Sequence, residues 1–281
     1  TITQTITQTV TQTITPTATA TKAIDKLVVT APASVTAGSV FYVTVTAMTS
    51  DNQVVENFFD TVGITTTASN AALPANYKYL AGDNGVHVFQ VTIYDSGTKQ
   101  LFASDLDNSL VKYGWADIVV FPSAAISFTI SAPSTVYAGQ QFWITVTAKD
   151  VYNNVVTNYD NIASFTSTDP LVGPGSGLPN AYDFNVSDNG KVILAVTLKT
   201  KGMQLITARE VGNPSVTGNS NGINVLAGAV YTFNVTAPSQ ANAGVGFVFT
   251  AVAKDQYGNT IDDYTGTVEK VNTGLLQLLL D

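Results

Sequence analysis

Residues 41–47 read Phe-Tyr-Val-Thr-Val-Thr-Ala, and close copies stand at residues 142–148 (Phe-Trp-Ile-Thr-Val-Thr-Ala) and 247–253 (Phe-Val-Phe-Thr-Ala-Val-Ala). In the first copy every second residue is apolar, and Tyr and Thr fill the places between. A period of two puts alternate side chains on opposite faces of a strand, so one face of each copy is predicted to lie in a core. We expect Phe41, Phe142 and Phe247 to occupy equivalent positions in that core.

Shorter landmarks surround each copy in the same order. They are an Ala-Pro pair at residues 31–32, 132–133 and 237–238, and an Ala-Gly pair at residues 37–38, 138–139 and 243–244. Every landmark moves by 101 residues from the first copy to the second and by 105 from the second to the third. Such repetition indicates tandem domains. We predict domains at residues 23–123, 124–227 and 228–281, after a tail at residues 1–22.

Turn-forming residues separate the predicted strands within each repeat. They are Asp51-Asn52, Asn153-Asn154 and Gly258-Asn259 after the three copies, and Asp-Asn-Gly at residues 83–85 and 188–190 before later strands. Asn and Gly tolerate the positive φ that tight turns require. Roughly seven short strands per hundred residues, with no amphipathic helix, predict an all-β protein of tandem immunoglobulin-like β-sandwiches.

Composition excludes several classes of function. The chain has 281 residues, 45% of them hydrophobic and 11% charged, and its net charge is −8. An acidic surface disfavours nucleic acid and anionic membranes as partners. The absence of cysteine excludes thiolate chemistry, and no apolar run reaches the roughly 18 residues of a membrane-spanning helix. Because the sequence starts at Thr1 rather than Met, we expect a mature extracellular protein whose signal peptide has been removed.

The first 15 residues alternate without a break. Every odd position is Thr, and Ile or Val recurs at every fourth residue: Ile2, Ile6, Val10 and Ile14. A long, uncharged alternating segment suits a strand that adds to an exposed sheet edge, with those four side chains in pockets. The alternative is an extended, O-glycosylated Thr-rich stalk, which needs no strict alternation.

The third repeat lacks the motifs that follow Gly258-Asn259 in the other two. It has no counterpart of the Leu-Pro-x-x-Tyr or Asp-x-Gly segments, so its late strands are missing and an apolar face is exposed. Either the sequence is cut short at Asp281, or another chain supplies the missing surface. We predict that Phe233, Phe247 and Phe249 form an acceptor groove for the N-terminal strand of another copy. Such a head-to-tail contact does not close on itself, and it generates a homopolymeric fibre.

The order Ala-Pro, Ala-Gly, Phe-x-Val-Thr-Val-Thr-Ala, Asn turn, Leu-Pro-x-x-Tyr and Asp-x-Gly resembles the Ig-like repeats of prokaryotic surface proteins. The second repeat matches best, with Leu178-Pro179 before Tyr182 and with Asp188-Asn189-Gly190, and the resemblance covers residues 23–270. The spare strand and the incomplete repeat together resemble donor-strand assembly in bacterial pili and archaeal thread-like filaments. The resemblance specifies a scaffold more than a function. The favoured function is a structural subunit of an extracellular filament that serves adhesion or biofilm cohesion.

Candidate sites for chemistry are few. His87 is the only histidine and has no Gly-x-Ser-x-Gly motif beside it, so we expect a structural role, no catalytic residue, no cofactor and no enzyme activity. Several aspartates offer oxygen ligands for calcium, without EF-hand spacing: Asp83, Asp105, Asp107, Asp188, Asp255, Asp262 and Asp263. Turn formation is the commoner use of such residues, and we expect no metal site.

Glycans enter the predictions in two ways. Asn185 and Asn234 begin Asn-x-Ser/Thr sequons, which makes them candidates for glycosylation. Trp115 and Trp143 have side chains that stack on sugars, so carbohydrate binding is a minor third interpretation, with surface glycans as partners. The main alternative to a filament subunit is a stalk or adhesin fragment of a larger Ig-repeat surface protein.

Overall fold

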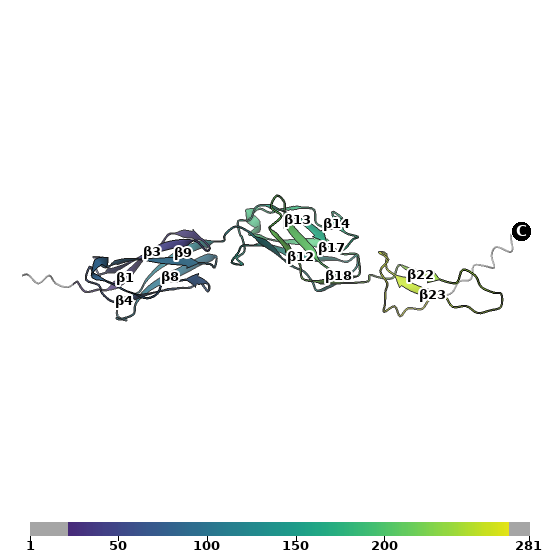
Figure 1. Cartoon of the computed structure of the whole chain (residues 1–281), viewed down its shortest axis with the longest axis horizontal. Helices are drawn as coiled ribbons and strands as arrows, with labels where there is room; N and C mark the ends of the chain where they lie inside the picture. The colour runs from purple at the N-terminus through teal and green to yellow at the C-terminus, as the bar shows by residue number, and fades with distance from the viewer. Residues whose placement is uncertain (1–21, 270–281) are drawn as a thin grey trace, which may run out of the picture. The chain divides into compact units, whose positions relative to one another are not determined.

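The computed structural model describes residues 22–269, which form two compact units, one ending at Phe121 and the other beginning at Pro122 (Figure 1). Strands and two short 3-10 helices make up all the regular structure of these residues, so the predicted all-β class is confirmed. None of these helices has the length and hydropathy needed to cross a membrane.

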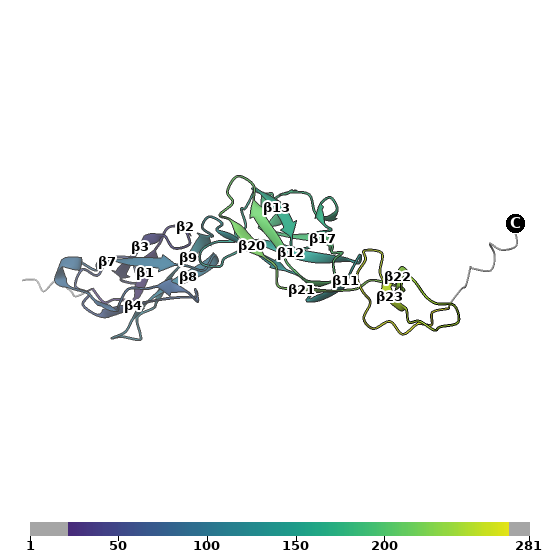
Figure 2. The same ribbon diagram turned by 45° about the vertical axis from the view of Figure 1, so that its right-hand side comes forward.

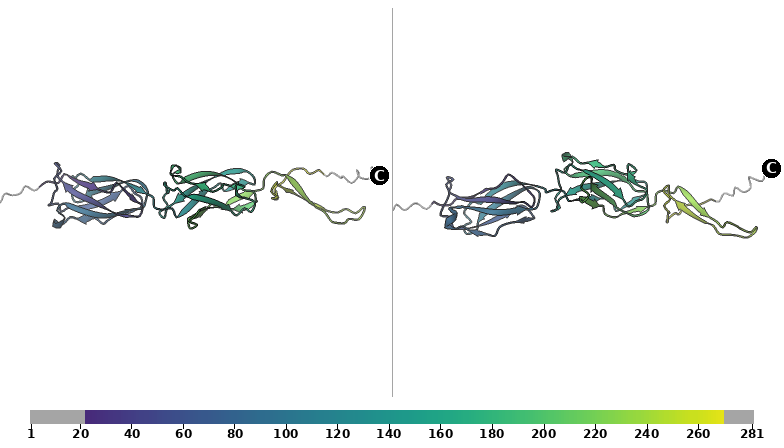
Figure 3. Two further views of the ribbon diagram at one scale, coloured as in Figure 1. Left: turned by 90° about the horizontal axis from the view of Figure 1, so that it is seen from above. Right: turned by 45° about the horizontal axis from the view of Figure 1, so that its top comes forward.

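The first unit is a sandwich of two sheets. One sheet has the order β1-β3-β7-β5, and the other has the order β2-β9-β8-β4-β6. The strands are β1 (Lys26–Thr30), β2 (Ser34–Thr36), β3 (Val40–Met48), β4 (Thr61–Thr66), β5 (Ala71–Ala72), β6 (Tyr77–Lys78), β7 (Val86–Ile93), β8 (Gly97–Asp105) and β9 (Gly114–Phe121). Views along two further directions show the two layers (Figure 3).

The second unit contains a complete sandwich and a shorter third segment. Its sheets have the orders β16-β13-β19-β20-β10-β12-β17, β11-β21-β18, β14-β15 and β22-β23. The strands of the sandwich are β10 (Ser127–Ser131), β11 (Thr135–Tyr137), β12 (Gln141–Lys149), β13 (Ile162–Ser167), β14 (Gly173–Pro174), β15 (Gly177–Leu178), β16 (Tyr182–Asp183), β17 (Lys191–Thr197), β18 (Gly202–Gln204), β19 (Ile206–Glu210), β20 (Thr217–Asn219) and β21 (Ile223–Leu226). A parallel contact between β10 and β20 joins the two layers at one edge.

The strand with the sequence Phe-x-x-Thr-Val-Thr-Ala contributes to the core of both complete sandwiches, as predicted. In β3, Phe41, Val43, Val45 and Ala47 are buried, while the intervening residues are exposed or half-buried. β12 repeats the pattern from Phe142, inside a core cluster that includes the rings of Phe128, Phe165, Tyr159 and Phe184. Burial of apolar side chains at about 25 cal/mol per Å² is the main stabilising contribution in such a sandwich.

The predicted Asp-Asn-Gly turns follow short 3-10 helices, η1 (Ala81–Asp83) and η2 (Val186–Asp188). Asn84 and Asn189 adopt φ of 49° and 51°, the left-handed region that Asn tolerates. A Cβ on the next residue, Gly190, would lie 2.2 Å from the carbonyl oxygen of Val156. The glycine is therefore required by a close backbone approach as well as by its own φ of 69°.

Asp150 closes the turn after β12 and also holds the segment that leads into this sandwich. Its Oδ1 accepts the backbone N–H groups of Tyr152 and Asn154, and its Oδ2 accepts the N–H of Ser123 at 3.0 Å. Burial opposes the charge, but these bonds and one from the Asn154 side chain outweigh burial and hold the pKa of Asp150 below its ordinary value. The first sandwich has Thr49 at this position.

Asp255 repeats the arrangement in the third segment, where its Oδ2 accepts the N–H of Gly228 at 2.9 Å. Asn259 of the same turn bonds to the second sandwich: its Nδ2 donates to the carbonyl of Lys199 at 2.7 Å, and its Oδ1 accepts the N–H of Lys201 at 2.9 Å. Hydrogen bonds therefore tie the third segment to the sandwich that precedes it.

Candidate functional site

The third segment contains a two-stranded antiparallel sheet (Figure 2). β22 (Thr232–Thr236) pairs with β23 (Thr250–Lys254), and Phe233 lies opposite Ala253. The same pairing joins β1 to β3 and β10 to β12 in the complete sandwiches. The third segment therefore begins as the other two repeats do.

Among its described residues, the third segment has no strand at the place of β7 or β17. β7 pairs with residues 40–46 of β3, and β17 pairs with residues 141–147 of β12. The equivalent residues of the third segment are 246–252, but β23 begins only at Thr250. The strand predicted over residues 247–253 is confirmed only in its second half, because the first half has no neighbouring strand to bond to.

The predicted acceptor residues carry exposed apolar surface. Phe41 and Phe142 are 5% and 8% exposed, whereas Phe247 is 55% exposed and Phe249 is 39% exposed. The expectation that Phe247 shares a core position with the other two is wrong for the described structure. The physical reason is that the strand and the second layer that cover Phe41 and Phe142 have no counterpart among the described residues of the third segment.

Phe233 is less exposed than Phe247 and Phe249. It is half-buried, and its ring packs edge-on against Tyr264 with 5.2 Å between centroids. Val245 and Val248, close to Phe247 in the chain, are also exposed. Exposed apolar side chains gathered in one segment are typical of an interaction site or of a face that another segment covers. The donor residues Ile2, Ile6, Val10 and Ile14 lie outside the described residues, so their pairing with this surface stays a prediction.

His87 lies in an aromatic cluster at the start of β7. Its ring stacks on Tyr77 with 3.6 Å between centroids and meets Phe89 edge-on at 4.8 Å. Its Nδ1 is 3.1 Å from Asp83 Oδ1, and the Tyr77 hydroxyl donates to Asp83 Oδ2 at 3.2 Å. These contacts connect η1 to β7, which is the structural role predicted for this residue.

One oxygen of a buried carboxylate in the first sandwich has no hydrogen-bond donor among the described residues. Asp105, at the end of β8, is 8% exposed, and its Oδ1 accepts the backbone N–H groups of Asp107 and Asn108 at 2.9 and 3.0 Å. Its Oδ2 is buried with no hydrogen-bond partner in the described part of the chain. Burial raises the pKa of Asp105, the two backbone donors act against burial, and the neighbouring carboxyl of Asp60 raises the pKa further.

The second sandwich shows what this carboxylate lacks. Glu210 stands at the equivalent position and accepts the hydroxyl of Tyr159 at 2.8 Å and the side-chain amide of Asn161 at 3.2 Å. The first sandwich has Phe58 and Asp60 where the second has this tyrosine and asparagine, so both side-chain donors are missing. Sequence reasoning missed this pair. The available signal was a comparison of the two repeats, which are offset by 101 residues at Phe58 and Asp60 and by 105 residues at Asp105.

Four of the other candidate calcium ligands cap 3-10 helices, accept hydrogen bonds or form ion pairs. Asp83 and Asp188 cap η1 and η2, Asp107 accepts from Thr61 and Lys78, and Asp262 forms an ion pair with Lys201. Nowhere in residues 22–269 do three His, Cys, Asp or Glu side chains gather so as to hold a metal ion.

The two sequon asparagines differ in their surroundings. Asn185 is exposed at the start of η2, but its side-chain nitrogen donates to Asp188 Oδ2 at 3.1 Å and its oxygen accepts the N–H of Ser187. Asn234 is exposed on β22, opposite Val252. Both remain candidates for glycosylation, and a glycan on Asn185 would leave its side-chain nitrogen a single N–H for the bond to Asp188.

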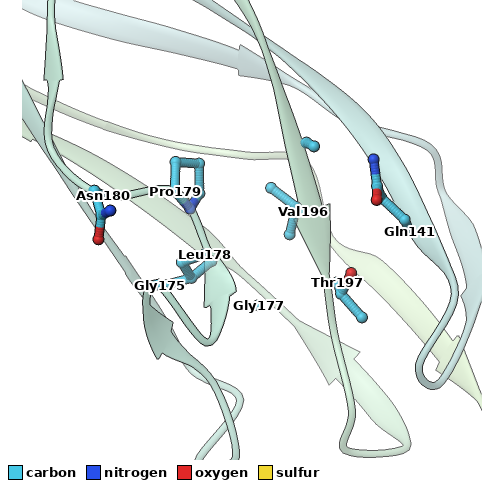
Figure 4. A pocket seen from close by; sticks show the side chains of 9 residues that line it. Gln141, Gly175, Gly177, Leu178, Pro179, Asn180, Val196 and Thr197 are labelled. Carbon is cyan, nitrogen blue, oxygen red and sulfur yellow. The ribbon is translucent and has the colours of Figure 1, made fainter.

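A hollow of about 330 Å³ lies between the segment that contains β14 and β15 and strand β17 (Figure 4). Its lining includes Gln141, Leu178, Asn180 and Thr197, and none of the lining side chains is charged. General acid–base catalysis requires an ionisable group within hydrogen-bond reach of the reacting atom. This hollow supplies none.

No protein-family model and no curated protein sequence matches the chain. Among solved structures, the Escherichia coli adhesin FdeC is similar, with 18% identity, a TM-score of 0.48, and 85% of this chain and 75% of that chain covered. Yersinia pseudotuberculosis InvD has 22% identity, a TM-score of 0.40 and coverages of 84% and 71%. Invasin, a bacterial integrin-binding protein, has 19% identity, a TM-score of 0.38 and coverages of 86% and 49%. One fold carries many functions, so similarity at this level does not assign one.

Proposed function

We propose that this protein is a non-enzymatic structural subunit of an extracellular filament, assembled head to tail by strand donation and serving adhesion or biofilm cohesion. The observation that carries the proposal is the exposed edge of the third segment. Residues 246–249 of that segment lie outside any strand, whereas the equivalent residues of both complete sandwiches are paired. A strand laid beside residues 246–252, as β7 and β17 lie beside the equivalent residues of the complete sandwiches, extends the sheet and covers Phe247.

The N-terminal segment has the chemistry of such a strand. It alternates strictly, it carries no charge, and Ile2, Ile6, Val10 and Ile14 share one face. Each apolar side chain of this kind contributes about 1.5–3 kcal/mol when it is fully buried. The glutamines between them must find partners or stay at the rim of the groove, because an unpaired buried amide is costly. The Thr face is the alternative inward face.

Deletion of residues 1–15 is expected to yield monomers from a chain that otherwise forms fibres. A synthetic peptide of residues 1–15 is expected to bind the truncated chain and to stop further growth when it is added to the full chain. Light scattering after gel filtration measures subunit number, and negative-stain microscopy measures fibre formation. Fibres of normal length from the truncated chain would contradict strand donation.

A matched pair of variants tests which face points inward. Replacing Ile2, Ile6, Val10 and Ile14 together by Thr keeps the β-branched character of the strand and removes the apolar contacts. The control replaces Thr3, Thr7 and Thr11 by Ser. We expect the first variant to lose assembly and the control to keep it. The reverse result would place the Thr face in the groove.

The second candidate function is a stalk within a larger adhesin, where the strand beside β23 comes from further residues of the same polypeptide. The observation that favours it is the repeated aspartate turn, because Asp150 and Asp255 each hold the backbone of the segment leading into their own repeat. Such a turn orders the segment that leads into a repeat, which suits a stalk of consecutive repeats. Native material seen as single beaded rods rather than uniform fibres supports this function.

Asp255→Ala is expected to loosen the connection to the third segment. The variant removes the acceptor for the N–H of Gly228 and the partner of Asn259, and loss of hydrogen bonds to a charged group costs about 1.5–3 kcal/mol each. Amide hydrogen exchange at Gly228 is expected to speed up at least tenfold. The control Asp262→Asn, which alters only an exposed ion pair to Lys201, should leave that exchange rate unchanged.

A further inference from the structure

Three aromatic side chains form a patch on the outer face of the first sandwich. Phe102 on β8 lies opposite Trp115 on β9, and Tyr113 precedes β9 with its ring 6.0 Å from that of Phe102. Trp115 is 53% exposed and Tyr113 is 60% exposed. We call Phe102, Tyr113 and Trp115 the aromatic patch. Exposed rings gathered in this way mark a surface that meets a ligand or partner.

The fold does not require these rings. In the second sandwich Thr207 lies between the buried Ile206 and Ala208, as Phe102 lies between the buried Leu101 and Ala103. The partner of Thr207 across the ladder is Asn219, where the first sandwich has Trp115, and the Thr207 hydroxyl donates to Asn219 Oδ1 at 2.8 Å. A polar pair therefore satisfies this position of the sheet, and the aromatic residues of the first sandwich need another explanation.

The next pair of outward-facing residues along β8 and β9 is polar and indicates what the patch binds. Gln100 lies opposite Asp117, and the Gln100 amide donates to Asp117 Oδ1 at 3.0 Å. Two lysines lie near these residues in sequence: Lys112 is held by Asp25 at 2.9 Å, and Lys99, next to Gln100, lies opposite Ile118 and has the other strand parity. A carboxylate beside the rings, with the net charge of −8, disfavours anionic ligands.

A neutral sugar matches these groups. The C–H face of a pyranose packs on an indole or phenol ring, and its hydroxyls donate to a carboxylate and accept from an amide. The patch is small for a protein partner, because a stable protein interface buries about 800 Å² on each side. We propose that the aromatic patch binds an uncharged hexose-containing glycan, with a pyranose stacked on Trp115 and hydroxyls bonded to Gln100 and Asp117. The site gives the proposed adhesive function a ligand and does not depend on strand donation.

The test uses the full chain and four soluble probes: cellohexaose, mannohexaose, laminarihexaose and chitohexaose. The chain has two tryptophans, so Trp143→Phe leaves Trp115 as the sole indole, and its fluorescence reports on the patch directly. We expect at least one probe at millimolar concentration to change this fluorescence, with matching heat of binding in calorimetry.

The decisive variant is Phe102→Thr with Trp115→Asn, which installs the pair that the second sandwich already carries. We expect it to keep the unfolding temperature of the first unit and to weaken binding by at least tenfold, while Trp143→Phe alone binds as the wild type does. Absence of binding to all four probes, or binding unchanged in the double variant, would overturn the proposal. Deletion of residues 1–15 should leave glycan binding intact, so the failure of one proposal is distinguishable from the failure of the other.

Discussion

Phe142→Ala is expected to destabilise the second sandwich by about 3–5 kcal/mol, the usual cost of removing a buried phenylalanine ring. Phe142 is 8% exposed and belongs to the core cluster of that sandwich, so alanine leaves a cavity among the other rings. Phe41→Ala should have a similar effect on the first sandwich. Urea unfolding of the full chain measures both, and each variant should lower the midpoint of its own sandwich alone.

Phe247 is the third residue of this equivalent set. Phe247→Ala is expected to change the free energy of unfolding by no more than about 0.5 kcal/mol in the unassembled chain. Its side chain is 55% exposed, so little contact is lost. If the acceptor proposal is right, the same variant binds the peptide of residues 1–15 at least tenfold more weakly. A loss of stability as large as that of Phe142→Ala would show that residues of the same subunit already cover this face.

Asp60→Asn is expected to stabilise the first sandwich by about 1–3 kcal/mol at neutral pH, the range for satisfying a buried polar group. The amide restores the donor that Asn161 provides to Glu210 in the second sandwich, and it removes the carboxyl that faces Asp105. The difference from the wild type should depend on pH. Because the pKa of Asp105 is raised in the folded state, the wild type gains stability from this pair below about pH 4 and loses that gain as the pH rises through the raised pKa.

The difference between variant and wild type is the quantity to measure, since other aspartates of the first unit act in the opposite sense. Four of them have lowered pKa values: Asp51, Asp83, Asp95 and Asp107. Their contribution is lost as the pH falls, and it cancels in the difference. Calorimetric unfolding from pH 3 to pH 8 should show a gain that is small in acid and grows towards neutrality. A gain independent of pH would mean that Asp60 and Asp105 do not interact.

The order of the repeats, the core strands of the two complete sandwiches and their turns were predictable from the order of residues. A period of two places Phe41, Val43 and Val45 on one face of their strand, whatever the strand packs against. Asn84 has the left-handed φ that its Asp-Asn-Gly turn predicts. Local periodicity and turn chemistry act over a few residues, so the sequence shows them directly. The same period of two predicts that Trp143 points away from the core, and it is exposed on β12.

Three features could not be predicted, because they depend on which strands pair in the tertiary structure. Asp60 and Asp105 approach because β4 pairs with β8, and Phe102 faces Trp115 because β8 pairs with β9 in one register. A shift of that register by one residue would turn each side chain to the other face, and nothing within either strand alone reveals its partner. Phe247 shows the converse. Its strand pattern matches that of Phe142, yet it is exposed, because burial is a property of the strands and layers that surround a residue.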